Sequence, residues 1–66
     1  MNNHIRELRL QFNITQEQLA ERVGVSRQSI IAIESQRYNP SLELAYKISQ
    51  SFNKSIEEVF IFNKEE

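Results

Sequence analysis

Arg27 and Gln28 stand directly behind a serine that can begin a helix, in the stretch GVSRQSIIAIES. Both side chains are long and form several hydrogen bonds. In a DNA major groove, arginine can donate two hydrogen bonds to guanine O6 and N7, and glutamine can pair in the same way with adenine N6 and N7. These residue types at a helix start therefore predict readout of DNA bases. The alternative is that Arg27 is an ordinary solvated surface arginine.

The residue types that enzymes and metal sites need are scarce. The chain contains no cysteine, no aspartate and a single histidine, His4, close to the amino-terminal end. The adjacent glutamates at 57–58 and 65–66 point in different directions on a helix, and neither pair has a histidine or cysteine beside it. We therefore expect no enzyme, no metal and no cofactor.

The length and charge of the chain narrow the possible classes of function further. A chain of 66 residues predicts one small domain, 1–66, with a thin core. The net charge is −1, but all five arginines lie in residues 1–40, against four glutamates, whereas residues 41–66 hold three lysines against five glutamates. Nucleic-acid binding would then need one local arginine-bearing face, since arginine is the better donor to phosphate and guanine. No apolar run exceeds four residues, so we expect no membrane span and a cytoplasmic location.

The spacing of capping and apolar residues predicts five helices and no strand of convincing length, which makes the fold all-α. Thr15 with Gln18 forms one predicted capping box, and Ser55 with Glu58 forms another. Gly24 is the expected stop of the second helix, because glycine enters the left-handed conformation without steric cost. The expected helices run from just after Asn2 or Asn3 to Phe12, and over 16–23, 27–36, 42–52 and 56–60.

Two of these helices, joined by a tight glycine turn and with Ser26 capping the second at once, form a predicted helix-turn-helix over about 16–36. Its second helix turns Gln28, Ile31 and Ala32 outward. The outward apolar pair can pack on thymine methyl groups, although one exposed apolar residue is also normal on a protein surface. The residues expected to face the core are Ile5, Leu8, Phe12, Leu19, Ala20, Val23, Ile30, Ile33, Leu42, Ala45, Ile48 and Phe52.

The stretch ITQEQLAERVGVSRQSIIAIESQRYNPSLELAYKIS closely resembles the Xre, or Cro/CI-like, phage-repressor family of helix-turn-helix regulators. The shared pattern is Thr-Gln-x-x-Leu-Ala, then Val-Ser-Arg, Ile-x-x-Ile-Glu and Asn-Pro-Ser-Leu, within residues 15–42. The resemblance extends over residues 4–60 and implies a five-helix, lambda-repressor-like DNA-binding domain. It is closest to small single-domain repressors that end in a short carboxy-terminal strand.

The resemblance also implies roles for individual residues. Arg27, Gln28 and Ala32 match the base-reading positions, and Ala32 departs from the longer polar side chain of many relatives. Arg9 and Glu34 match a partly buried ion pair. The residues that match phosphate-contacting positions are Gln16, Ser26, Ser29, Arg37, Tyr38 and Asn39.

Structural roles compete with three of these phosphate assignments. Ser26 is first a helix cap. Gln16 can be no more than the first residue of a capped helix, and the Tyr38 ring can instead pack on the fourth helix.

Apolar residues near the end of the chain exceed what a five-residue helix can cover, notably in the run VFIF. One interpretation is that they close the edge of a thin core. The interpretation we favour is a two-fold dimer interface, with the tail 61–66 as its main part. The predicted interface residues are Leu44, Phe60, Ile61 and Phe62.

Together these patterns predict a sequence-specific regulator of double-stranded DNA. The favoured form is a homodimeric repressor in the cytoplasm, associated with the nucleoid, that reads a palindrome and blocks polymerase. The alternative is an antitoxin or other protein-interaction module, for which a long tail would be expected. Only four polar residues follow Phe62.

Overall fold

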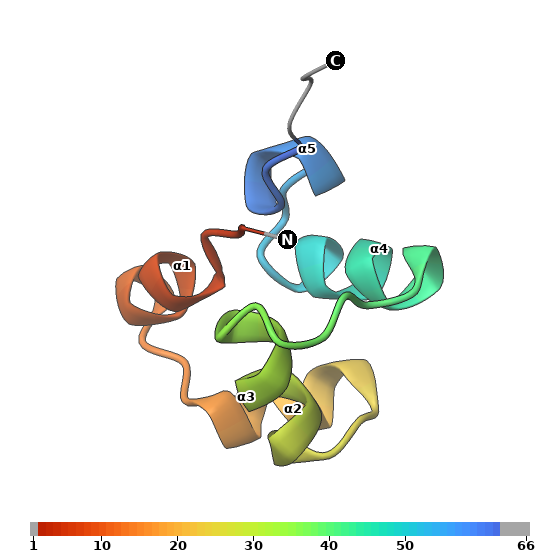
Figure 1. Ribbon diagram of the computed structural model, residues 1–66. Coiled ribbons are helices and arrows are strands. Elements are labelled where there is room, and N and C mark those ends of the chain that lie inside the picture. The colour runs from red at the N-terminus through yellow and green to blue at the C-terminus, as the bar shows by residue number, and fades with distance from the viewer. Residues whose placement is uncertain (1, 63–66) are drawn as a thin grey trace.

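The chain is described from a computed structural model, which covers residues 2–62 (Figure 1). The described residues form five helices and no named strand, so the predicted all-α, five-helix fold is confirmed. The molecule measures 36 × 20 × 19 Å. The helices are α1 (Ile5–Phe12), α2 (Gln16–Val23), α3 (Arg27–Glu34), α4 (Leu42–Ser51) and α5 (Ile56–Val59).

Side-chain caps begin four of the helices. The Thr15 hydroxyl accepts a hydrogen bond from the Gln18 backbone N–H at 3.0 Å, and the Gln18 side chain accepts one from the Thr15 N–H at 2.9 Å, which completes the predicted capping box. Ser26 caps α3 and Ser41 caps α4 in the predicted manner. Ser55 begins α5 with the second predicted capping box. These local hydrogen bonds satisfy N–H groups that have no partner inside a helix.

Four helices end at a residue with left-handed backbone. Gly24 ends α2 with φ of 79°, as predicted. Asn13, Gln36 and Asn53 take the same conformation at the ends of α1, α3 and α4. At α3 the Arg37 N–H then donates to the Ala32 carbonyl at 2.9 Å. This turn ends α3 at Glu34, two residues before the predicted end of the helix.

The core fills the space between all five helices. α2 packs against α3 and α4, and α4 packs against α5. The buried apolar side chains of the core are Ile5, Leu8, Ile14, Leu19, Ala20, Val23, Ile30, Ile33, Ala45, Ile48, Phe52, Val59 and Phe60. Within the described range, no helix combines the length and the hydrophobicity that crossing a bilayer demands.

Two residues expected in the core lie at the surface. Leu42 is 76% exposed, because at 100° per residue it is turned about 90° from the direction shared by Ala45 and Ile48. Leu44 packs partly against the core instead. Phe12 is 43% exposed, although its ring meets the Phe52 ring edge-on at 5.5 Å.

The two ends of the described chain lie side by side. Asn3 and Phe60 form an isolated antiparallel β-bridge, which is the only β pairing in residues 2–62. The His4 N–H donates to the Val59 carbonyl and the Ile61 N–H donates to the Asn2 carbonyl, both at 2.8 Å. The short carboxy-terminal strand implied by the resemblance is therefore reduced here to one bridge, and 63–66 of the predicted tail lie outside the described residues.

Candidate nucleic-acid interface

The first turn of α3 presents two long polar side chains to solvent. Ser26 caps this turn through its hydroxyl, which accepts a hydrogen bond from the Ser29 N–H at 3.2 Å. The next residues, Arg27 and Gln28, are exposed and project from the helix start. A helix start of this kind can enter a major groove end-on, with both side chains able to pair with a base edge.

A hollow of about 750 Å³ lies beside this turn, between α1, the start of α2 and the start of α3. Arg27 lines it from α3, and Arg6 lines it from α1. Thr15 and Gln16 line it from the start of α2, whose N–H groups and helix dipole favour an anion. The hollow therefore brings Arg6, Arg27 and a helix amino terminus together on one face. Its lining also includes Glu17 and the paired residues Arg9 and Glu34.

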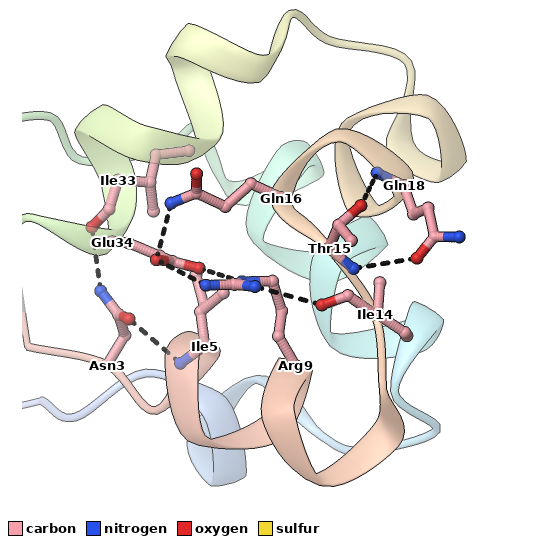
Figure 2. A network of polar contacts seen from close by, with 9 residues as sticks. All are labelled: Asn3, Ile5, Arg9, Ile14, Thr15, Gln16, Gln18, Ile33 and Glu34. Atoms are coloured by element: carbon pink, nitrogen blue, oxygen red, sulfur yellow. Dashed lines mark hydrogen bonds and ion pairs between the residues drawn. The ribbon is translucent and has the colours of Figure 1, made fainter.

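An ion pair beneath the hollow joins α1 to α3. The Arg9 guanidinium donates to both carboxylate oxygens of Glu34, with its Nη2 atom 3.3 Å from Oε1 (Figure 2). Their side chains are only 12% and 10% exposed. Arg9 Nη1 also donates to the Ile14 carbonyl at 3.1 Å, which ties the loop after α1 into the same network. With its charge balanced, Arg9 adds little to the net positive charge of the face.

Gln16 belongs to this network as well as to the edge of the hollow. Its Nε2 atom donates to Glu34 Oε1 at 3.1 Å, and the residue is partly buried (Figure 2). The start of α2 is thereby held against the end of α3. A phosphate role for Gln16 stays a prediction, and its side chain already has a structural partner.

The outward side of α3 behind the first turn is smaller and less polar. Ile31 and Ala32 are each partly exposed, and Ile31 is not among the side chains packed on the core cluster. The Ser29 and Ser26 hydroxyls lie 3.2 Å apart and can bond to one another. The face thus combines two long hydrogen-bonding side chains with an apolar pair, as the sequence indicated.

The loop after α3 carries the remaining residues predicted to contact phosphate. Arg37 and Tyr38 are exposed, and the Arg37 Nε atom donates to the Ser35 hydroxyl at 3.4 Å. Tyr38 is 52% exposed, so its ring is not buried against α4. Asn39 is exposed in the same loop. This loop lies at the opposite end of α3 from the first turn and can contact a second stretch of DNA backbone.

The predicted dimer residues separate into two groups. Phe60 is only 1% exposed and fills the core of its own chain, which corrects the prediction of an interface role for its side chain. The bridge to Asn3 fixes Phe60 in this position. Leu44 is partly buried against the core. Ile61 and Phe62 remain at the surface, 39% and 53% exposed, beside a hollow of about 490 Å³.

Sequence reasoning missed two residues that bear on this site. Arg6 is one of the five arginines of residues 1–40, and no sequence pattern assigned it to this face, yet it lines the same hollow as Arg27. Its position three residues before Arg9 on the same helix is the signal that was available. The sequence places Asn3 only before the first expected helix. Its side-chain amide reaches the Ile33 carbonyl at 3.0 Å, a contact that no local pattern indicates.

Comparison with known proteins agrees with this geometry. Residues 5–59 match a family model described as helix-turn-helix. The chain is 56% identical over 66 residues to an uncharacterized HTH-type transcriptional regulator of Archaeoglobus fulgidus, which covers all of this chain and 93% of the relative. It is 50% identical to a second such regulator, from Methanocaldococcus jannaschii, with both chains covered in full.

A solved structure has the same fold. The clp gene regulator ClgR from Corynebacterium glutamicum matches with a TM-score of 0.77 and 26% sequence identity. The match covers 82% of this chain and 57% of that one, so the chain spans little more than half of the solved protein. The protein therefore belongs to the helix-turn-helix family of DNA-binding transcriptional regulators.

Proposed function

We propose that this regulator is a repressor that binds a palindromic operator in double-stranded DNA as a homodimer. The observation that carries the proposal is the first turn of α3, where Arg27 and Gln28 are exposed. The helix behind them is anchored at its far end by the Arg9–Glu34 ion pair. A rigid helix with free polar side chains at its start suits base readout, because bidentate contacts need fixed geometry.

In this proposal the four outward residues of α3 read the bases. Arg27 pairs with guanine and Gln28 with adenine, and each good bidentate contact contributes about 1–3 kcal/mol of discrimination. Ile31 and Ala32 pack on thymine methyl groups. The phosphate contacts come from the two sides of α3, with Arg6 added to the predicted set of Gln16, Ser26, Ser29, Arg37, Tyr38 and Asn39.

A second copy would complete the reading of a palindrome. Ile61 and Phe62 offer exposed apolar surface beside a hollow. They follow α5 in the chain, and α5 lies at the other end of the molecule from α2 (Figure 1). An isologous dimer through this surface leaves both recognition helices free. Two recognition helices then read half-sites about 34 Å apart, one turn of DNA.

Repression follows from occupancy in this proposal. A dimer over a promoter covers DNA that polymerase needs, and it acts without catalysing a reaction. Such a protein works on chromosomal DNA in the cytoplasm.

A protein partner is the second candidate. Leu42 and Tyr46, one turn apart on α4, are 76% and 55% exposed. They lie on one surface of the helix and can contact another protein, as an antitoxin contacts its toxin. This surface is separate from the first turn of α3, so the two functions are compatible.

The decisive experiment is selection from random duplex DNA at physiological salt, followed by sequencing of the retained molecules. We expect an enriched palindrome with half-sites about one turn apart. Transcription from a promoter carrying that palindrome should fall when the protein is added. A folded sample that enriches no sequence would contradict the proposal, and activation of the promoter would contradict the repressor role.

The dimer is tested by its own pair of variants. Ile61→Lys places a charge on the proposed interface and should shift the protein to monomer in sedimentation equilibrium. Leu42→Lys places the same charge on an exposed leucine of α4 and should leave the dimer intact. If both variants and the wild type have the same mass, the interface is elsewhere or does not exist.

A further inference from the structure

The Asn3 side chain bridges the start of α1 and the end of α3. Its Oδ1 atom accepts a hydrogen bond from the Ile5 N–H at 3.1 Å, and Ile5 is the first residue of α1. Its Nδ2 atom donates to the Ile33 carbonyl at 3.0 Å (Figure 2). Asn3 and Ile33 are 30 residues apart in the sequence. One partly buried amide therefore uses its donor on one helix and its acceptor on another.

The backbone around Asn3 is paired with the carboxy-terminal segment on its other side. The β-bridge to Phe60 is flanked by the hydrogen bonds from His4 to Val59 and from Ile61 to Asn2, both 2.8 Å long. Residue 3 thus lies between the last turn of α3 and the segment 59–61. The side chain of Phe60 is buried, so this segment has little freedom to move independently.

We propose that Asn3 is a positioning residue for DNA recognition, which fixes the angle of α3 relative to the segment 59–61. The inference rests on the proposed function, which assigns the dimer contact to Ile61, the last residue of this segment, and to Phe62, which follows it. In the dimer, the spacing and tilt of the two recognition helices depend on how rigidly each α3 is joined to its own tail. The Asn3 amide is the side chain that makes this connection.

Asparagine suits this position because it carries a donor and an acceptor on a short side chain. Aspartate keeps the acceptor for the Ile5 N–H and favours a helix start, but it cannot donate to the Ile33 carbonyl. Asn3→Asp therefore removes the link to α3 while the hydrogen bond from the Ile5 N–H remains. Asn2→Asp adds the same charge one residue away, where the side chain is exposed, and is the matched control.

The test measures binding of wild type and both variants to the operator obtained by selection, and to the same half-sites with one base pair inserted between them. All measurements are made below the unfolding transition recorded by circular dichroism. We expect Asn3→Asp to bind the operator about three- to tenfold more weakly, which is the loss expected for one hydrogen bond. It should also discriminate less between the two spacings, and binding to non-specific DNA should stay the same. Asn2→Asp should bind like the wild type.

Other outcomes overturn the inference. If Asn3→Asp keeps both the affinity and the spacing preference of Asn2→Asp, Asn3 does not position α3. If Asn3→Asp binds operator and non-specific DNA more weakly by the same factor, the substitution weakens DNA binding in general and does not act through the position of α3. Should Asn3→Asp be unfolded, Asn3→Ala is compared with Asn2→Ala. Asn3→Ala removes both side-chain hydrogen bonds, and the same loss of spacing preference is expected. A wild type without any preferred sequence refutes the proposed function itself, which is a different result from a variant that behaves like its control.

Discussion

Gln16 donates its side-chain amide to the Glu34 carboxylate at 3.1 Å, and so joins the first residue of α2 to the last residue of α3. The same carboxylate accepts hydrogen bonds from Arg9 of α1. One acidic group thus holds three helices in register at the edge of the proposed DNA-binding face. The partly buried Glu34 carboxylate, shared by Arg9 and Gln16, therefore makes this face rigid. Its contribution matters because so short a chain has only a thin core.

Loss of this network should destabilise the fold. Arg9→Ala leaves the Glu34 carboxylate partly buried without its countercharge, and we expect the free energy of unfolding to fall by about 2–4 kcal/mol in urea titrations. Gln16→Ala should cost about 1.5–3 kcal/mol, because one hydrogen bond to a charged group is lost. Lys47→Ala is the control. Its ion pair with Glu43 is exposed and 3.7 Å long, and its loss should cost less than about 0.5 kcal/mol. Equal effects of Arg9→Ala and Lys47→Ala would contradict this account.

Two residues with left-handed backbone at helix ends, one a glycine and one not, allow a pair of substitutions with opposite expected effects on stability. Gly24 has φ of 79°, and a Cβ atom added there meets no heavy atom within 4 Å. Gly24→Ala should therefore cost only the backbone strain, about 1 kcal/mol in the free energy of unfolding. Gln36 has φ of 68° at the equivalent position after α3, so Gln36→Gly should stabilise by about 0.5–1 kcal/mol. Changes of the same sign in the two variants would show that strain at these positions is not the deciding quantity.

The elements set by contacts within four residues were predictable from the sequence. Thr15 and Gln18 cap each other across three positions, and Gly24 needs only its own freedom of φ. Such features depend on local chemistry alone. The ends were less predictable, since α3 ends at Glu34 and the left-handed residue that follows it, Gln36, is not a glycine.

Contacts between distant segments set the features that the sequence did not reveal. The Asn3 amide meets the Ile33 carbonyl only because the amino-terminal segment lies beside the end of α3. The same segment pairs with the backbone of Phe60, and the Phe60 side chain is buried, so a residue predicted at a dimer interface closes the core instead. Neither contact has a periodic or local signature.

The capping box of α5 predicts a pH dependence of stability. The hydrogen bond from the Ser55 backbone N–H, helped by the charge of Lys54, holds the pKa of Glu58 below its usual value of 4.5. A lowered pKa in the folded state means that Glu58 contributes stability above pH 4.5, which is lost as the pH falls through the lowered pKa. Glu58→Gln keeps the acceptor and removes the titrating charge. We expect a flatter stability curve for this variant between about pH 5 and 3 in thermal unfolding. A curve parallel to that of the wild type would contradict the assignment.

Arg27→Ala and Arg37→Ala should impair DNA binding in different ways. If Arg27 reads a guanine, Arg27→Ala loses about 1–3 kcal/mol of preference at one base pair of each half-site and keeps most of its non-specific affinity. If Arg37 contacts phosphate, Arg37→Ala binds every sequence more weakly, and the slope of log K against log salt falls by about one. Arg22, exposed near the end of α2 beside α4, is the control, and Arg22→Ala should change neither quantity. The measurement is a titration of the selected operator and its single-base variants at several salt concentrations. Uniform weakening by Arg27→Ala, with base preference unchanged, would assign Arg27 to the DNA backbone and leave Gln28 as the main hydrogen-bonding reader on α3.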